Sequence, residues 1–158
     1  MQVFDTSSLI YAWDNYPIEQ FPGLWEWMAD RVQQGVIRLP QIAVEEVGHK
    51  TQECLQWLNQ ANHQTLPITE AILIEATRIK KLLEIGEKYG AGVDENDLLI
   101  IATAKLHDAE LVTNEDLQLT PNKKKQNWKI PAVCNMPSVQ VPCTNYLNYL
   151  KRSQAVFG

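Results

Sequence analysis

Four acidic residues lie beside short apolar runs of the chain: Asp5, Glu46, Asp97 and Glu115. Carboxylate oxygens are the ligands that Mg²⁺ and similar hard cations prefer in proteins. Clustered carboxylates repel one another, and they stay ionised together only when a cation is present. If the fold brings these acids together, they predict a divalent-metal site. A water made more acidic by such a metal can attack a phosphodiester in line.

Asp5 follows a short, partly apolar segment and precedes Thr6, Ser7 and Ser8, which are good helix N-caps. One interpretation is therefore a turn or N-cap acid. The other is a metal ligand at the edge of a sheet. The position at the end of the first strand favours the ligand, because α/β sheets bind ligands beyond the carboxyl ends of their strands.

Asp94 and Asp97 lie at the start of an expected helix, where the helix dipole stabilises acids without a metal. Asp97 differs because the apolar run from Leu98 to Ala102 follows it at once. An acid that opens a buried helix needs a partner or a metal. Asp94 lies one helical turn away, and it either shares the metal or caps the helix.

Glu46 has a close competitor in Glu45, because both lie in one expected helix and only one can face inward. Glu46 precedes the apolar Val47, and Ile42 lies one turn before it, so Glu46 is nearer the buried face. Periodicity alone still favours a solvated helix acid. His49 lies one turn further on and is interpreted as a surface histidine.

Glu115 and Asp116 follow a strand that ends in Thr113 and Asn114. This end places a carboxylate beside Asp5 if the two strands are neighbours. The alternative is a turn with a capping acid, and the sequence favours neither. Whether Glu115 or Asp116 is the relevant acid is also open at this stage.

Lys123, Lys124 and Lys125 form a basic stretch soon after Glu115. A solvated loop is the ordinary interpretation, and contact with a phosphate backbone is the functional one. The formal net charge of −5 counts mildly against a nucleic-acid binder, since phosphate contacts usually need a basic surplus. A cluster of metal-binding acids offsets this argument, because bound metal neutralises it.

Strands and helices alternate along the chain, which indicates an α/β domain with a mainly parallel sheet. We expect strands at 2–5, 36–39, 110–113 and 139–141. We expect helices at 6–13, 24–34, 41–59, from the cap at Thr69 to about Tyr89, from Glu95 or Asn96 through Lys105, at 130–135 and at 145–151.

The length of 158 residues fits one domain, and we expect residues 1–158 to form it. The three cysteines are odd in number and widely spaced, which favours a reduced, cytoplasmic setting. The N-terminus lacks the basic and apolar regions of a signal peptide. No apolar stretch approaches the roughly 18 residues of a membrane span, so no membrane association is expected.

Four segments together resemble the motifs of PIN-domain nucleases, and they occur in the order of that family. They are V-F-D-T-S-S-L-I with Asp5, I-A-V-E-E-V with Glu46, D-L-L-I-I-A-T-A with Asp97, and A-E-L-V-T-N-E-D with Glu115. The segments K-I-P-A-V-C and V-Q-V-P-C resemble a less characterised prokaryotic branch of PIN-like proteins. The last acid of the family is usually Asp, and the extra methylene of Glu115 moves its carboxylate by about 1.5 Å.

The resemblance implies a three-layer α/β/α sandwich around a mainly parallel sheet of four or five strands. It implies Mg²⁺- or Mn²⁺-dependent hydrolysis of RNA, by a ribonuclease that could be the toxin of a type II toxin–antitoxin module. An antitoxin protein and a homodimer are the partners it implies, with aromatic residues near Trp25 and Trp27 as a candidate interface.

On this hypothesis Asp5 and Asp97 hold the main ion, and Glu46 and Glu115 orient it or hold a second one. Asp94 and Asp116 are further candidate ligands. Four polar residues would support the acids by hydrogen bonds: Thr6, Ser7, Thr113 and Asn114. The competing hypotheses are a catalytically weak or inactive scaffold of the same fold, and a phosphohydrolase of small phosphate esters.

Overall fold

The computed structural model describes residues 1–120 and 122–158. All paired strands are parallel, and they form one five-stranded sheet in the order β3-β2-β1-β4-β5. Their bounds are β1 (Gln2–Phe4), β2 (Ile37–Pro40), β3 (Thr65–Leu66), β4 (Glu110–Val112) and β5 (Cys143–Thr144). The predicted parallel sheet is therefore confirmed.

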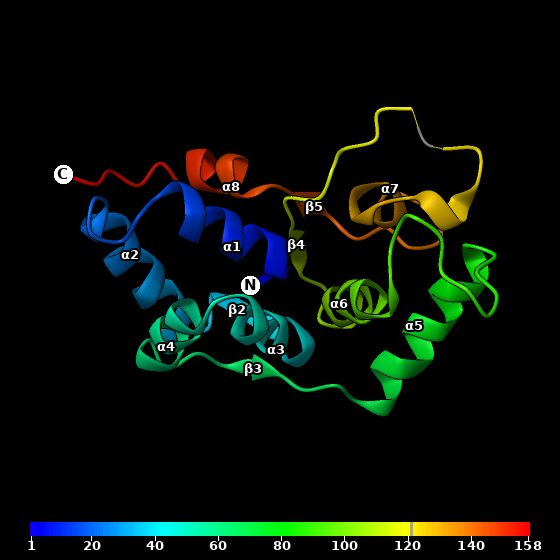
Figure 1. Ribbon diagram of the computed structural model, residues 1–158, viewed down its shortest axis with the longest axis horizontal. Helices are drawn as coiled ribbons and strands as arrows, with labels where there is room; N and C mark the ends of the chain where they lie inside the picture. The colour runs from blue at the N-terminus through cyan, green and yellow to red at the C-terminus, as the bar shows by residue number, and fades with distance from the viewer. Residues whose placement is uncertain (121) are drawn as a thin grey trace.

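Helices cover both faces of the sheet, which gives the predicted three layers (Figure 1). In Figure 1, α1, α2 and α8 lie on the left of the strands, and α5, α6 and α7 lie on the right. The helices are α1 (Thr6–Asn15), α2 (Pro22–Gln33), α3 (Gln41–Lys50), α4 (Gln52–Gln60), α5 (Glu70–Leu82), α6 (Glu95–Leu106), α7 (Ile130–Cys134) and α8 (Tyr146–Ser153), with a short 3₁₀ turn at Lys125–Asn127.

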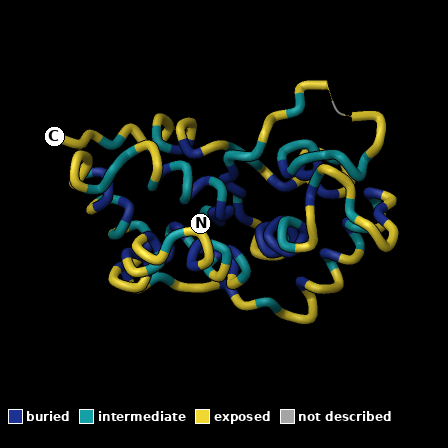
Figure 2. Tube along the Cα trace, viewed as in Figure 1, coloured by how far each residue is buried: buried dark blue, intermediate teal, exposed yellow. Residues whose placement is uncertain are grey.

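The sheet and α6 form the centre of the core, where Figure 2 is darkest. Val3, Phe4, Leu111 and Val112 are fully buried, as expected for parallel strands covered on both faces. Helix α6 is buried from Leu98 to Ala104, as its nearly all-apolar face predicts. Because α6 sits between the sheet and α5, the acids at its first turn are held at a fixed distance from the strand ends.

Two expected helices end earlier than the sequence suggests. The run from 41 to 59 is not one helix but two, because it breaks at Thr51, whose hydroxyl accepts a hydrogen bond from the backbone N–H of Cys54. The helix expected to reach Tyr89 ends at Leu82, and Glu84 follows in the left-handed conformation (φ 56°). In both places local hydrogen bonds at the helix end override a continuing apolar pattern.

The strand expected at 139–141 is wrong. Gln140 has a φ of +50°, which no strand residue adopts, and the chain pairs with β4 only at Cys143–Thr144. Strand β3 was not expected, because two residues are too few for a periodic pattern.

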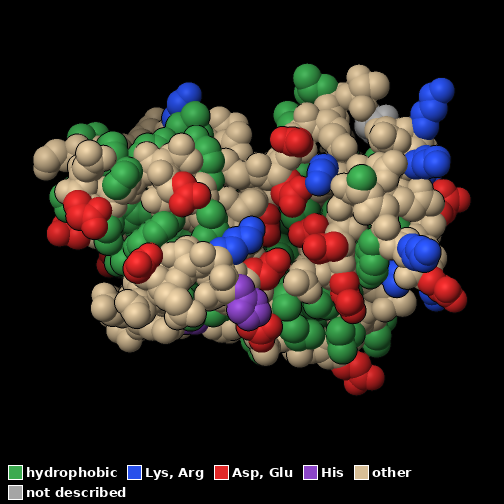
Figure 3. All heavy atoms as spheres, viewed as in Figure 1, with side chains coloured by type: hydrophobic (Ala, Val, Ile, Leu, Met, Phe, Trp, Pro, Cys, Tyr) green, Lys and Arg blue, Asp and Glu red, His purple; other side chains and the backbone are tan. Residues whose placement is uncertain are grey.

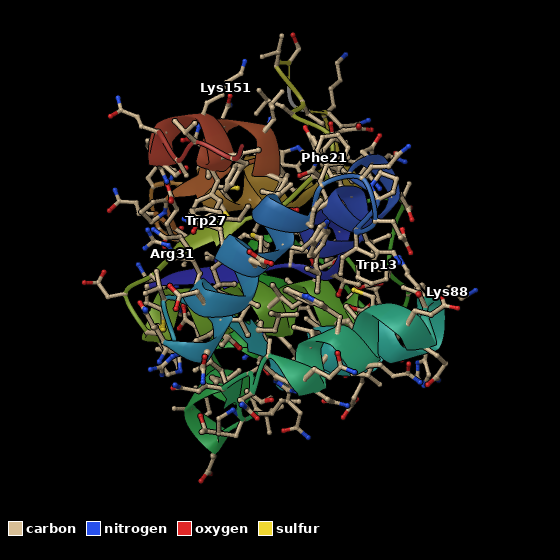
Figure 4. The ribbon with its side chains drawn as sticks, turned by 90° about the vertical axis from the view of Figure 1, so that its left-hand side faces the viewer. Trp13, Phe21, Trp27, Arg31, Lys88 and Lys151 are labelled. Carbon is tan, nitrogen blue, oxygen red and sulfur yellow. The ribbon has the colours of Figure 1, made fainter. Side chains whose placement is uncertain are left out.

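The tryptophans near the N-terminus fill the core on the α2 side. Trp25 is 2% exposed and packs edge-on against Trp13 and Trp57, so it is not available as an interface residue. Trp27, also on α2, is only half-buried, and the guanidinium group of Arg31 lies 5.1 Å from the centre of its ring (Figure 4). Within the part of the chain that the structure describes, no helix has the length and apolar character needed to cross a membrane.

Candidate functional site

The candidate site lies where β1 and β4 end side by side. Phe4 is paired with Val112, and the backbone N–H of Asp5 donates to the carbonyl of Val112 at 2.9 Å. The chain leaves β1 toward one face of the sheet through α1, while α6 on the other face leads into β4. Asp5 and Thr113 therefore meet at the point of the sheet where connections diverge, which is where α/β folds bind ligands.

Asp5 is an almost completely buried acid, with 3% of its surface exposed. One carboxylate oxygen accepts hydrogen bonds from the hydroxyls of Ser7 at 2.6 Å and Thr113 at 2.8 Å. Burial raises the pKa of Asp5, and these hydrogen bonds oppose the rise. Hydroxyl and backbone donors, all neutral, hold this carboxylate, and no ion pair joins it to another of the described residues. A cation would supply the missing positive charge.

The hydroxyls of Ser7 and Thr113 tie α1 to the segment after β4. The two oxygens lie 3.2 Å apart, and the Ser7 hydroxyl accepts from the backbone N–H of Asn114 at 2.9 Å. The side-chain oxygen of Asn114 in turn accepts from the backbone N–H of Tyr146 at the start of α8. Three segments distant in the sequence are thus fixed around Asp5.

Glu46, and not Glu45, faces the site. Its carboxylate accepts a 2.8 Å hydrogen bond from the hydroxyl of Thr6, the residue next to Asp5. Glu45 and His49 are both exposed. The choice that periodicity left open is therefore made by the packing of α3 against α1.

Asp94 and Asp97 form a reciprocal capping box at the start of α6. The Asp94 carboxylate accepts from the N–H of Asp97 at 2.8 Å, and Asp97 accepts from the N–H of Asp94 at 3.1 Å. Burial, together with the negative charges of Asp94, Asp5 and Glu115, raises the pKa of Asp97 to about 8. Asp94 is thus an exposed cap. Asp97 is half-buried, and its carboxyl interacts electrostatically with the carboxylates of Asp5 and Glu115.

Glu115 is half-buried beside the cluster, whereas Asp116 is exposed. Burial and the charge of Asp5 raise the pKa of Glu115, and the ammonium group of Lys129 opposes the rise. The nearest oxygen of Glu115 lies 3.8 Å from the Lys129 nitrogen. The structure therefore places Glu115, rather than Asp116, next to the other acids.

The acids fit a divalent cation by their chemistry. Figure 3 shows Asp and Glu side chains gathered in the middle of one face of the molecule, between the α1 side and the α6 side. Among residues 1–120 and 122–158, no three acidic, imidazole or thiol groups already converge on one point. Mg²⁺ needs only one or two direct carboxylates and keeps several waters, so a site with two acids fits it by chemistry.

Lys129 is the site residue that sequence reasoning missed. It opens the K-I-P-A-V-C segment after the polar loop, outside the four acid motifs, and nothing in the sequence links it to Glu115. Lys123 and Lys124 are exposed and Lys125 is half-buried, in the segment that leads to Lys129. Their contact with nucleic acid stays a prediction.

Solved structures identify the class of fold. The chain resembles VapBC2 from Rickettsia felis bound to a DNA fragment from the promoter, with a TM-score of 0.57 and 16% identity over 91% of this chain and 97% of that one. It resembles DNA-bound VapBC from Salmonella typhimurium (TM-score 0.56, 14% identity, 92% and 97% covered). It also resembles FitAcB from Neisseria gonorrhoeae (TM-score 0.54, 17% identity, 93% and 99% covered). The fold is therefore that of PIN-domain proteins, as the four motifs predict.

A family model sharpens this assignment. The model of the domain of unknown function DUF4411 matches residues 2–157, and the chain belongs to this family. No curated protein sequence matches the chain.

Proposed function

We propose that this protein is a metal-dependent endoribonuclease, built as one PIN-like domain over residues 1–158. The observation that carries the proposal is the group of carboxyls around Asp5. Asp97 and Glu115 lie close enough to Asp5 and to each other for their charges to interact, at the carboxyl edge of the sheet. Repulsion among these carboxylates destabilises the folded protein without a cation. With a bound cation they form a site that can activate water for hydrolysis.

Asp5 and Asp97 would hold Mg²⁺ or Mn²⁺, and Glu46 and Glu115 would orient waters around it. When bound, the ion makes a water more acidic and neutralises charge on the phosphate. A metal ligand must also be held in one orientation, and the hydroxyls of Ser7 and Thr113 do this for the Asp5 carboxylate.

Lys129 would contribute a positive charge beside the negatively charged phosphate. Its ammonium group, 3.8 Å from Glu115, would bind an oxygen of the scissile phosphate or keep Glu115 in position. A phosphate between a cation and an ammonium group is stabilised as negative charge develops during in-line displacement.

The test is cleavage of a mixed RNA pool by the wild type with Mn²⁺, by the wild type with EDTA, and by Asp5→Asn with Mn²⁺. We expect cleavage only in the first reaction. Equal cleavage in all three would rule out a metal nuclease. Metal binding without cleavage of RNA would support the scaffold alternative, and hydrolysis of a chromogenic phosphate ester alone would support the phosphohydrolase.

We further propose that the protein is the toxin of a toxin–antitoxin pair. The proposal is supported by the similar structures, which are those of VapBC2, VapBC and FitAB bound to DNA. Expression in a host cell should arrest growth, and Asp5→Asn should not. Co-expression of the neighbouring reading frame should restore growth by binding this chain; failure of every neighbouring frame to do so would contradict the proposal.

A further inference from the structure

A groove lies beside Glu115, between the segment that follows β4 and the α7–β5 region. Its volume is about 790 Å³. Figure 1 shows the segment after β4 and helix α7, which both contribute lining residues, on the same side of the molecule. Its lining includes Leu117, Leu119, Lys125, Trp128 and Cys143.

The groove adjoins a pocket that Glu115 lines. A smaller pocket of about 140 Å³ is lined by Thr113 and Glu115, and it shares Leu117, Pro131 and Cys143 with the groove. A chain-like ligand that lies in the groove can therefore continue into the space beside Glu115 without leaving the surface.

One wall of the groove exposes apolar side chains to solvent. Leu117 is 71% exposed and Leu119 is 87% exposed. Neither residue contributes much to folding at this exposure, and both offer apolar surface to a ligand in the groove.

The segment of Trp128, which also lines the groove, is held in place next to the acidic site. The indole N–H of Trp128 donates to the carbonyl of Asn122 at 2.7 Å, which orients the ring. The backbone N–H of Val93 donates to the carbonyl of Trp128 at 2.9 Å, directly before the cap of α6. The wall and the Asp94–Asp97 turn are thus one connected unit.

The wall also carries positive charge in a chain whose net charge is −5. Lys123, Lys124, Lys125 and Lys129 fall within seven residues, and Lys125 itself lines the groove. Phosphate groups complement such a stretch, and flat bases stack on aromatic and apolar side chains. An apolar peptide would use the leucines but would leave these lysines without a counter-charge.

We propose that this groove binds an unpaired nucleotide of single-stranded RNA, next to the phosphate that the acidic site cleaves. The base lies against the apolar wall at Trp128 and Leu117, and the backbone phosphates face Lys125 and Lys129. Single-stranded segments fit because only unstacked bases can be splayed onto such a wall. The inference rests on the proposed ribonuclease function, since it assigns the substrate of that site.

The first test measures binding without catalysis. The affinity of a short, fluorescently labelled single-stranded RNA is measured by anisotropy in EDTA, for the wild type, Leu117→Asp and the control Leu73→Asp. Leu73 is 50% exposed on α5 and lines a different groove of about 440 Å³, so both variants put a new acid on an exposed leucine. We expect the Kd of Leu117→Asp to rise about tenfold and that of Leu73→Asp to stay unchanged.

The second test locates the RNA. The same RNA carrying 5-iodouridine is irradiated with the wild-type protein in EDTA, and the cross-linked peptides are identified. We expect cross-links within 117–136, at Trp128 above all. Cross-links confined to other surfaces, no binding by the wild type, or equal affinities for wild type and Leu117→Asp would each overturn the inference.

Failure of this inference differs from failure of the proposed function. Mn²⁺-dependent cleavage with an unchanged Kd for Leu117→Asp would leave the nuclease and remove the groove as its substrate site. Binding in the groove without any cleavage would keep the groove as an RNA site and remove the nuclease. Loss of a protein partner in Leu117→Asp with unchanged RNA affinity would assign the groove to that partner and overturn the inference.

Discussion

Thr113 and Asp5 are 108 positions apart in the sequence, and a 2.8 Å hydrogen bond joins the threonine hydroxyl to a carboxylate oxygen of the aspartate. The bond exists because β1 and β4 are neighbours and end at the same level of the sheet. The bond orients the almost completely buried carboxylate of Asp5. The central acid of the candidate metal site therefore has a fixed orientation before any ion binds.

Thr113→Val should weaken metal binding and cleavage by about 10–100-fold, because it removes a hydroxyl that orients a ligand and leaves the shape nearly unchanged. Titration with Mn²⁺ and RNA cleavage check this. The control is Thr103→Val, which is also buried but bonds only the carbonyl of Leu99 within α6. Equal effects of both variants would mean that the Thr113 hydroxyl acts through general stability.

Asp97→Asn should stabilise the metal-free protein by about 1 kcal/mol, or about 2–4 °C in Tm for a chain of this size. The reason is the raised pKa of Asp97, about 8, which reflects burial and neighbouring negative charge. Asparagine keeps an oxygen to accept from the N–H of Asp94 and removes the charge.

The pH dependence gives the sign of this effect. Because folding raises the pKa of Asp97, the protonated acid contributes stability at low pH, and that stability is lost as pH rises through about 8. In EDTA, the advantage of Asp97→Asn over the wild type should therefore grow from pH 4 to pH 8. Added Mn²⁺ should raise the Tm of the wild type only; a matching rise in the variant would exclude Asp97 as a ligand.

Glu46→Gln should lower Mn²⁺ affinity about tenfold, and Glu45→Gln should leave it unchanged. Glutamine at position 46 can still accept the hydrogen bond from Thr6, so the variant removes charge and keeps the packing of α3 on α1. Isothermal titration with Mn²⁺ compares the two directly. A larger loss for Glu45→Gln would reverse the assignment of the helix acid.

Gly92→Ala should destabilise the fold by about 2–4 kcal/mol, whereas Gly86→Ala should change stability by no more than about 0.5 kcal/mol. A Cβ at Gly92 would lie 2.2 Å from the carbonyl oxygen of Trp128, and one at Gly86 meets nothing within 4 Å. Urea unfolding measures both. Equal stability of the two variants would show that the wall formed by the Trp128 segment is not packed against Gly92.

Local patterns in the sequence determined much of this site. Asp5 and Glu115 follow strands, and parallel strands of one sheet end at the same edge, so their proximity follows from order alone once β1 and β4 are neighbours. The run from Leu98 to Ala102 likewise predicts a buried helix, and its first-turn acids are then close to the sheet. Such features depend on periodicity and on the ends of elements, which a single sequence carries.

Only the tertiary structure decided between Glu45 and Glu46, and only it placed Lys129 beside Glu115. The helix acid was ambiguous because the face of α3 that turns inward depends on how α3 packs against α1. The lysine lies in an irregular segment, whose course is set by contacts with distant residues such as Gly92 and Val93. Long-range packing has no period in the sequence, and the positions it controls therefore become visible only in the folded chain.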